Sequence, residues 1–518
     1  MSMYRKWAKR RNAILSVALF GMLALPNVGQ ATNITKHDAA NNGTIKTAGN
    51  VHNVFADRVV GNTAINHFKN FNLSQGNIAN LFFGKSVDSA TAARLFNFVD
   101  NKVDIAGIVN AVQNNKIGGD LRFISPKGIA VSSTGVINAG QVGMVVPTDK
   151  YYKELLGNDN LLTSADLLSA KSIQNGEVPL NLTGTITVAG HINTVGGMTL
   201  AAANIELNDG ALLNSQKLID YKDIVNVKDG SVAVNSGLGN NLTLKRDKES
   251  GDIVLAAVAD SKNTAEEGGL SGKLNNKLDG TGVNVFRIAN WDISKPIGAS
   301  IKMAKDAKID ADSNVVMAAK ALSNNVKPEK PKDQKKQDEK AKAELEKKTK
   351  EAIQNTKTLL GLNAGIELAG KITGKTVNVT ATTKDDYQFD KDMAKEIKAT
   401  NLLQEYIKIS GAYMMHKDTA NVAIGKDAQI KATGDDIAGK PDKDGKTPAP
   451  TPAISVLASS ELNAKLASEG KVEGKKNQLL AATFSYYKNN ASLTVAGLLL
   501  LENPWLDQGF RKALAMSL

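Results

Sequence analysis

The chain has 518 residues, a formal net charge of +12 and no cysteine. The lack of cysteine excludes disulfide bonds and cysteine-based metal or redox sites, so the fold has to be held by packing and backbone hydrogen bonds. Aromatic residues make up only 5% of the chain, which argues against a stacking surface for nucleic acid, and no nucleic-acid partner is expected.

The first 31 residues predict a secretory signal peptide. Five basic residues precede an apolar run, Ala13 to Leu25, which is followed by Pro26 and by small residues ending at Ala31. We expect cleavage after Ala31. The run of 13 residues is shorter than the ~20 that span a bilayer, so a retained anchor is the less favoured alternative. Cleavage removes five of the 64 basic residues and none of the 52 acidic ones, which leaves a net charge of +7.

Short β-type runs bounded by Asn and Gly fill residues 33–147, and Val103 to Ile105 is one example. Asn and Gly tolerate the left-handed backbone of tight corners. A leucine-rich stretch from Thr148 to Ser172 then predicts a helical excursion, with Thr148 as the cap in front of Asp149.

From Leu182 onward, pairs of apolar residues with one residue between them recur between Gly, Asn and Asp. This spacing places both apolar side chains on one face of a strand, and it predicts strands of about three to five residues. A sandwich or a barrel would favour hairpins and longer alternating strands. The sequence therefore predicts an all-β protein, a right-handed parallel β-helix with helical excursions and a charged helical insertion.

Two insertions interrupt the strand pattern: the charged stretch Lys327 to Lys350, and Gly439 to Pro452, which reads as a Pro-rich corner or linker. The mixed charge of the first favours a solvated loop and helix over a lipid-binding or heparin-like patch. The end of the chain, Ala491 to Leu518, has a leucine run in place of the coil pattern. The predicted divisions are a signal peptide (1–31), a first β-helical domain (32–150), its continuation (151–326), the charged insertion (327–358), further coils (359–490) and an atypical tail (491–518).

No local motif predicts catalysis. AGKITGKT at residues 369–376 approximates a phosphate-binding loop, but a β-type run follows it where a helix is needed, so a coil corner is the better interpretation. Asp310, Asp312 and Asn314 begin like a calcium loop but lack its later Gly and Glu, and Asp442, Asp444 and Gly445 form only a fragment of one.

The five histidines stand far apart in the sequence and lack zinc-binding spacing, so no metal site and no cofactor are predicted; they are His37, His52, His67, His191 and His416. A solenoid can nevertheless bring distant residues together, and β-helical enzymes with paired carboxylates leave no local signature. We therefore expect a protein that is not an enzyme, and we keep a β-helical glycan-active enzyme as an alternative.

Two blocks of sequence stand out in order along the chain: NHFKNFNLSQGNIANL at 66–81 and DIAGIVNAVQNNKIGGDLRFISPKGIAVSSTGVINAG at 104–140. Together they resemble the two-partner secretion domain, also called the haemagglutination-activity domain, of filamentous haemagglutinin-like exoproteins. The family's NPNGI block corresponds to Ser125–Ile129, where Ser and Lys replace the two asparagines. This departure resembles a leukotoxin-like branch of filamentous adhesins. The similarity covers residues 33–147.

The resemblance implies a right-handed parallel β-helix that is exported through a dedicated outer-membrane transporter and ends up secreted or at the cell surface. It also implies a secretion signal read by the transporter. The residues carried over as that signal are Asn70, Phe71, Asn72, Ser125, Pro126, Gly128 and Ile129. The same residues would also serve as corners and coil interior.

The leading functional hypothesis is a filamentous adhesin of the two-partner type, associated with virulence, whose loops bind a host-cell or surface glycan receptor. A leukotoxin-like cytotoxin on the same scaffold is the first alternative. Relatives of this branch are usually far longer, so we also expect the chain to be a truncated reading frame or a fragment of a longer filament.

Overall fold

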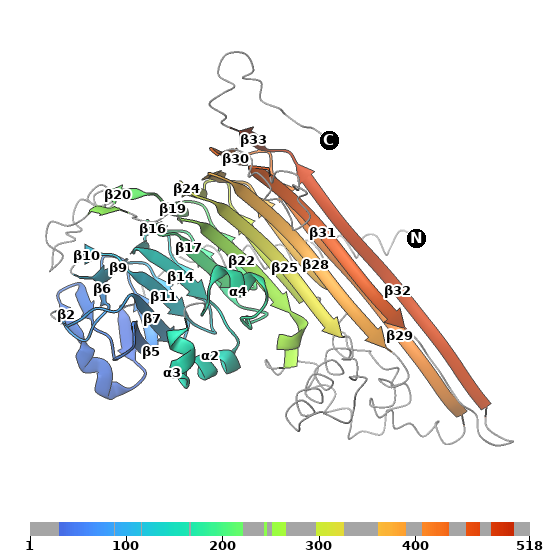
Figure 1. Cartoon of the computed structure of the whole chain (residues 1–518), viewed down its shortest axis with the longest axis horizontal. Coiled ribbons are helices and arrows are strands. Elements are labelled where there is room, and N and C mark those ends of the chain that lie inside the picture. The colour runs from blue at the N-terminus through green and yellow to red at the C-terminus, as the bar shows by residue number, and fades with distance from the viewer. Residues whose placement is uncertain are drawn as a thin grey trace, which may run out of the picture.

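The computed structural model describes residues 31–87, 89–114, 116–164, 167–220, 243–245, 251–265, 297–325, 361–389, 407–434, 452–466 and 478–501. Within these ranges the strands form one sheet of 19 strands and another of 12, together with a two-stranded hairpin. The strands lie side by side in chain order along the molecule (Figure 1).

Each coil contributes one strand to each of three parallel columns. The first column contains β7 (Arg94–Val99), β11 (Asp120–Ile124), β14 (Gln141–Val145), β17 (Met198–Ala202), β22 (Ile253–Asp260), β25 (Val315–Asn325), β28 (Val377–Phe389) and β31 (Ile454–Leu466). The second contains β8 (Val103–Ile105), β12 (Ile129–Val131), β15 (Thr185–Val188), β18 (Asn204–Leu207), β23 (Ile297–Met303), β26 (Leu362–Leu368), β29 (Ile407–Ile424) and β32 (Gln478–Val495). The third contains β3 (Val51–Val54), β6 (Ile78–Phe82), β9 (Ile108–Gln113), β13 (Val136–Asn138), β16 (His191–Thr194), β19 (Leu212–Ser215), β24 (Lys308–Ala311), β27 (Lys371–Gly374), β30 (Gln429–Ala432) and β33 (Leu498–Leu501).

This arrangement confirms the predicted right-handed parallel β-helix. The inward side chains of all three columns form one continuous apolar core along the axis. Ile129 and Val131 are both buried in it, and Val136 begins the next strand, as the spacing predicted. Each coil thus covers the apolar face of its neighbours, which is how a solenoid buries a core without a compact centre.

The prediction of three to five residues per strand was wrong for several strands. β5 (Thr63–Leu73) has 11 residues, β28 has 13, and β29 and β32 have 18 each. β5 is long because it passes through a corner and pairs with both β7 and β8. β28 extends its ladder with β31 through polar pairs such as Lys384 and Glu461, and β29 and β32 pair with each other over their full length. Apolar alternation marks only the part of such a strand that lines the core.

Antiparallel pairs lie at the start of the solenoid. β1 (Asn33–Lys36) and β4 (Arg58–Val60) both pair antiparallel with β5, and β2 (Ile45–Ala48) pairs antiparallel with β3. A 3-10 helix, Ala39–Thr44, connects β1 to β2. These segments pair with the first parallel strands at an end that would otherwise expose unpaired backbone. Other short elements are β10 (Lys116–Ile117), β20 (Leu218–Asp220), β21 (Thr243–Lys245) and a second 3-10 helix (Ser261–Ala265).

The predicted helical excursion is confirmed and comprises α2 (Asp149–Leu156), α3 (Asp159–Thr163) and α4 (Ala170–Gln174). The Thr148 side chain accepts a hydrogen bond from the Tyr151 backbone amide and so caps α2, as predicted. The helices lie along one side of the early coils (Figure 1). Their apolar side chains form a second core against the outward residues of the first column.

A ladder of asparagine side chains runs along the third column. Each Nδ2 donates to an Oδ1 on the adjacent coil, at 2.9–3.0 Å for the four rungs that join Asn53, Asn80, Asn110, Asn138 and Asn193. A longer bond of 3.4 Å from Asn214 ends the series. Each amide within the ladder both donates and accepts a hydrogen bond. The ladder therefore provides partners for buried polar groups that would destabilise the fold without them.

Two of the predicted divisions fall inside single elements of the structure. The division at 150/151 falls inside α2 and the one at 490/491 inside β32. Residues 491–495 of β32 pair with β29, and β33 pairs with β30, so residues 491–501 continue the solenoid and do not belong to an atypical tail. The signal peptide up to residue 30, the charged insertion (327–358) and residues 502–518 lie outside the described residues. No helix in the described ranges is long and apolar enough to cross a membrane.

Candidate functional site

The two sequence blocks that resemble a secretion domain meet at one corner of the solenoid, where the chain turns from the first column to the second. In the first coil this corner is Lys69–Asn70 within β5. The residues of β5 that precede the corner pair with β7, and those that follow it pair with β8. In the second coil the corner is residues 100–102, and in the third it is Ser125–Gly128. We call this stack of turns the corner column. The helical excursion leaves the fourth coil at the same corner.

Hydrogen bonds join the corner column from coil to coil. Asn70 Nδ2 donates to Thr35 Oγ1 at 3.0 Å, and Asn70 Oδ1 accepts from Asn101 Nδ2 at 2.8 Å. The Asn101 carbonyl accepts from Ser125 Oγ at 2.8 Å, and the Pro126 carbonyl accepts from Asn181 Nδ2 at 3.2 Å. Asn101, which sequence reasoning missed, therefore connects the first block to the second.

The residues carried over from the second block are buried. Ser125 and Ile129 have no exposed surface, and Pro126 and Gly128 are also buried. Gly128 has a φ of +101°, and a Cβ there would lie 3.0 Å from the Thr185 carbonyl oxygen. The turn thus requires glycine both for its backbone conformation and for close packing against the fourth coil.

In the first block, Phe71 fills the core, whereas Asn70 and Asn72 are half-buried. The Phe71 ring contacts Phe68 and Phe123 edge-on, with centroid distances of 5.2 and 5.1 Å. Its neighbours in register are Ile34 of β1 and Val103 of β8. Phe71 therefore ties the N-terminal strand to the first three coils.

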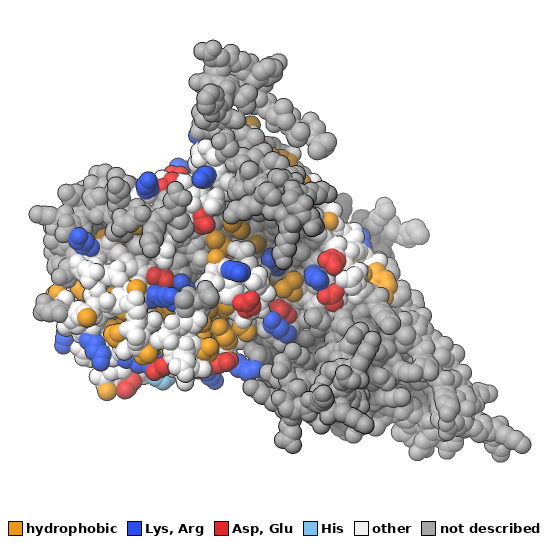
Figure 2. Space-filling view, in the orientation of Figure 1, with side chains coloured by type: hydrophobic (Ala, Val, Ile, Leu, Met, Phe, Trp, Pro, Cys, Tyr) orange, Lys and Arg blue, Asp and Glu red, His pale blue; other side chains and the backbone are white. Residues whose placement is uncertain are grey.

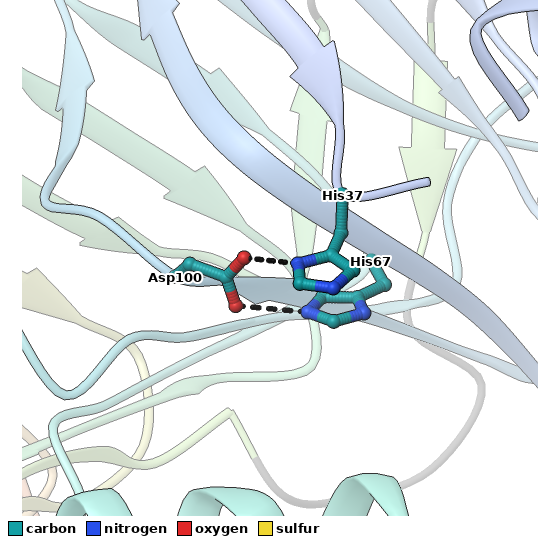
Figure 3. A group of neighbouring side chains, drawn as sticks. All are labelled: His37, His67 and Asp100. Atoms are coloured by element: carbon teal, nitrogen blue, oxygen red, sulfur yellow. Dashed lines mark hydrogen bonds and ion pairs between the residues drawn. The ribbon is translucent and has the colours of Figure 1, made fainter. Parts of the chain in front are cut away.

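At Asp100, in the second coil's part of the corner column, two histidines from distant parts of the sequence meet one carboxylate (Figure 3). His37 Nδ1 lies 2.5 Å from Asp100 Oδ2, and His67 Nε2 lies 2.9 Å from Asp100 Oδ1. The two imidazole rings stack, with centroids 4.1 Å apart and planes within 8°. The Tyr152 hydroxyl of α2 donates to Asp100 Oδ1 at 3.0 Å. We call these residues the histidine cluster.

The carboxyl of Asp100 is held ionised by its donors. Partial burial by itself would raise its pKa, but hydrogen bonds from His37, His67 and Tyr152 outweigh burial and lower the pKa below its ordinary value. Burial, with the neighbouring Asp100 and Asp149 carboxylates, raises the pKa of the Tyr152 phenol, which therefore stays protonated and donates.

Comparisons with known proteins found a similar solved structure. No family model and no curated protein matches the chain. The chain is similar to the crystal structure of the HMW1 secretion domain from Haemophilus influenzae, at 11% identity over 92% of this chain and 100% of that one, with a TM-score of 0.24. A TM-score this low does not establish a shared fold, so the fold assignment rests on the strand pairing described above.

The motifs that resemble phosphate- and calcium-binding loops lie in ordinary strands and turns of the solenoid where the structure describes them. Within AGKITGKT, Ala369 and Gly370 form a coil corner, Lys371–Gly374 is β27, and β28 follows the motif where a phosphate-binding loop needs a helix. A Cβ on Gly370 would lie 2.3 Å from the Ala307 carbonyl oxygen, so the interpretation as a coil corner is confirmed. Asp310 lies in β24 and Asn314 follows a turn, where its backbone and side-chain amides donate to Asp252. Asp442, Asp444 and Gly445 lie outside the described residues.

His52 and His191 lie apart from the cluster. His52 is in β3 and His191 is in β16, both in the third column. The side chain of His416 lies outside the described residues. The sequence spacing therefore gave no signal for the meeting of His37 and His67, which arises from coil stacking.

A buried ion pair, which was not predicted from the sequence, links the N-terminal strand β1 to the first coil. The Lys36 ammonium is fully buried, 2.8 Å from Asp57 Oδ1 and 2.6 Å from Asn66 Oδ1, and it lies over the Phe68 ring. The second oxygen of Asp57 accepts the His67 backbone amide at 2.8 Å. Burial lowers the pKa of Lys36 from 10.5 to about 8, although Asp57 opposes the shift.

This shift predicts a stability that rises in mild alkali. Between pH about 8 and 10.5 the unfolded chain keeps a proton on Lys36 that the folded chain has released, so the free energy of unfolding increases with pH in that window. The shift corresponds to a cost of roughly 3 kcal/mol for the charged form in the folded state. Thermal unfolding of the wild type and of Lys36→Met, measured from pH 7 to 10.5, checks this. The difference in unfolding midpoint between the wild type and Lys36→Met should change between pH about 8 and 10.5. Midpoints that change with pH in parallel would contradict the prediction.

Proposed function

We propose that this chain is an exported, non-enzymatic β-helical protein of the two-partner type. Its first coils act as the secretion domain for an outer-membrane transporter, and the later coils form an adhesin that binds a host-cell or surface glycan receptor. No cofactor and no nucleic-acid partner belong to this proposal. The protein would act outside the cell, secreted or attached to the surface.

The observation that carries the proposal is the corner column. Two blocks of sequence, selected for their resemblance to a secretion domain, supply the same corner of the first and third coils, and Asn101 in the second coil connects Asn70 to Ser125 by hydrogen bonds. Residues that share a function as one recognition element are expected to lie together. The antiparallel strands β1, β2 and β4 lie beside the first parallel coils, so this corner lies near the start of the solenoid.

The burial of the second block indicates when a transporter would read it. Because Ser125, Pro126, Gly128 and Ile129 are buried in the folded coils, a partner can reach them only while the chain is still extended. An extended segment can add a strand to the edge of a sheet in a partner. Coil-by-coil folding outside the cell would then withdraw the segment and favour outward movement without nucleotide hydrolysis.

The visible surface is compatible with this role. Basic and acidic side chains are interspersed on the face in Figure 2, with no extended stretch of one sign among the described residues. A mixed surface of this kind does not favour phosphate-backbone binding, which needs clustered positive charge.

A secretion assay tests the proposal. Co-expression with a two-partner transporter should release the protein into the medium, and Gly128→Ala should lower the released amount at least ~10-fold. The variant forces an L-residue into a left-handed backbone, at a cost of about 1–2 kcal/mol, in a segment that has to change from extended to folded.

Gly210→Ala is the matched control. Gly210 has a φ of +84° in a later coil, so alanine there carries a similar backbone cost, while its Cβ would have an ordinary contact of 3.6 Å. We expect near-normal secretion of this variant. Release that is independent of the transporter, or equal loss for both variants, would contradict the assignment of the corner column as the signal.

The finer assignment as an adhesin needs a separate measurement. Purified protein added to host cells should adhere without loss of viability. Lysis of leukocytes would favour the cytotoxin alternative, and release of sugars from surface glycans would favour the enzyme alternative.

A further inference from the structure

The histidine cluster offers three metal-ligand atoms from three separate passes of the chain. His37 follows β1, His67 lies in β5 and Asp100 follows β7. One ligand atom from each lies within 4.8 Å of the others. Figure 3 shows one carboxylate oxygen directed at each ring. The sequence separations between these residues give no metal-binding motif, so the set exists only in the folded protein.

We propose that His37, His67 and Asp100 form a zinc-binding site on the first two coils. Imidazole nitrogen and carboxylate oxygen bind Zn²⁺ at about 2.0–2.2 Å, which places ligand atoms of a tetrahedral site about 3.3 Å apart. The Asp100 oxygens are 2.5 and 2.9 Å from the two histidine nitrogens. Insertion of the ion therefore requires each of these two contacts to lengthen by less than about 1 Å, together with a rotation of the His37 ring and loss of the protons that now bridge the contacts.

Two of the three ligands are held in place by their surroundings. The Tyr152 hydroxyl donates to Asp100 Oδ1, and the buried Tyr152 ring packs edge-on against Phe98 at 5.6 Å. The His67 backbone amide donates to Asp57 Oδ2, and its carbonyl accepts from the His37 amide at 2.9 Å. Hydrogen bonds of this kind around a carboxylate ligand typically orient metal ligands.

His37 is the ligand that can move. Its side chain is 55% exposed, compared with 27% for His67 and 28% for Asp100. Because the two rings are stacked and parallel, His37 has to turn out of the stack to point its nitrogen lone pair at an ion bound to the other two. Solvent reaches all three side chains, so water would complete the coordination.

The ligand set selects the class of ion. Two imidazoles and one carboxylate suit zinc and the neighbouring transition metals, whereas calcium and magnesium prefer sites made of oxygen ligands. Zinc would bind the folded arrangement alone, because the three ligands are far apart in an extended chain. Binding would therefore fasten the N-terminal strand to the first two coils.

Calorimetric titration of the purified, metal-free protein with Zn²⁺ tests the site. We expect one zinc per chain, a thermal unfolding midpoint that rises with zinc concentration, and no comparable effect of Ca²⁺ or Mg²⁺. Co²⁺ in place of Zn²⁺ should give visible absorption bands of a coordinated ion.

Variants separate this site from adventitious binding. His37→Ala and Asp100→Asn should weaken zinc binding at least ~100-fold, and Tyr152→Phe should weaken it about 10-fold, as expected for a residue that orients a ligand. His52→Ala is the matched control, since His52 lies in β3, outside the cluster, and it should bind zinc like the wild type.

If Asp100→Asn fails to fold, His37→Ala alone tests the zinc site. The His37 side chain is exposed and contributes little to the core, so this variant should fold. Its circular dichroism without zinc should match the wild type. Unchanged zinc affinity in His37→Ala, or no stoichiometric binding by the wild type up to millimolar zinc, would overturn the proposal. These outcomes do not depend on whether the chain is exported or adhesive.

Discussion

Phe71→Ala is expected to destabilise the first coils by about 3–5 kcal/mol, the usual cost of removing a fully buried phenylalanine. The ring has no exposed surface and contacts Phe68 and Phe123 edge-on. It also lies in register between β1 and β8. The substitution therefore removes packing from the N-terminal strand and from the next two coils together.

The effect of Phe71→Ala should be local. In a solenoid each coil contacts only its neighbours, so the loss should propagate weakly along the axis. Hydrogen exchange followed by mass spectrometry should show amides of β1, β5 and β8 exchanging at least ~100-fold faster, which corresponds to about 3 kcal/mol, since each 1.4 kcal/mol is a factor of ten. Amides of β25 and β28 should be unchanged. Phe71→Leu, which keeps much of the volume, should cost far less.

Equal acceleration in β25 and β28 would contradict the nearest-neighbour description of the fold. An unchanged rate in β5 would contradict the assignment of Phe71 to the core. The experiment also bears on secretion, because Phe71 belongs to the first block carried over from the resemblance. A variant with weakened first coils that is still released normally would separate the structural role of Phe71 from any role as a signal.

The sequence predicted the fold where the information is local. The alternation of Ile129 and Val131 shows which face of a strand is buried, and Gly128 marks the corner before it, because both properties depend on residues next to each other in the chain. Thr148 predicted the start of α2 for the same reason. These signals were sufficient for a parallel β-helix and for the helical excursion.

Contacts between coils could not be predicted because the coils differ in length. Successive residues of the asparagine ladder are 27, 30, 28, 55 and 21 positions apart, and the 55 includes the helical excursion. Without a fixed repeat, the sequence does not show which residue of one coil faces which residue of the next. The histidine cluster, the Lys36–Asp57 pair and Asn101 all depend on that register, and all three were missed.

The asparagine ladder yields the second large expected effect. Asn138 donates to Asn110 and accepts from Asn193, and its side chain has no exposed surface. Asn138→Ala leaves an acceptor on one coil and a donor on the other without partners, and each orphaned buried group costs about 1–3 kcal/mol. We therefore expect a loss of about 2–4 kcal/mol, centred on β9, β13 and β16, where amide exchange should accelerate.

Asn214→Ala is the control, because Asn214 is half-buried at the end of the ladder and its bond of 3.4 Å is long, so its loss should cost about 1 kcal/mol or less. The double variant Asn110→Ala with Asn138→Ala should cost less than the sum of the single variants, since the second substitution removes a group that the first left unpaired. If the stability losses of the two single variants add up to that of the double variant, the two amides act independently and the ladder is not a coupled network. Coupling would show that the stacked amides act as one hydrogen-bonded network and so help to fix the register between coils.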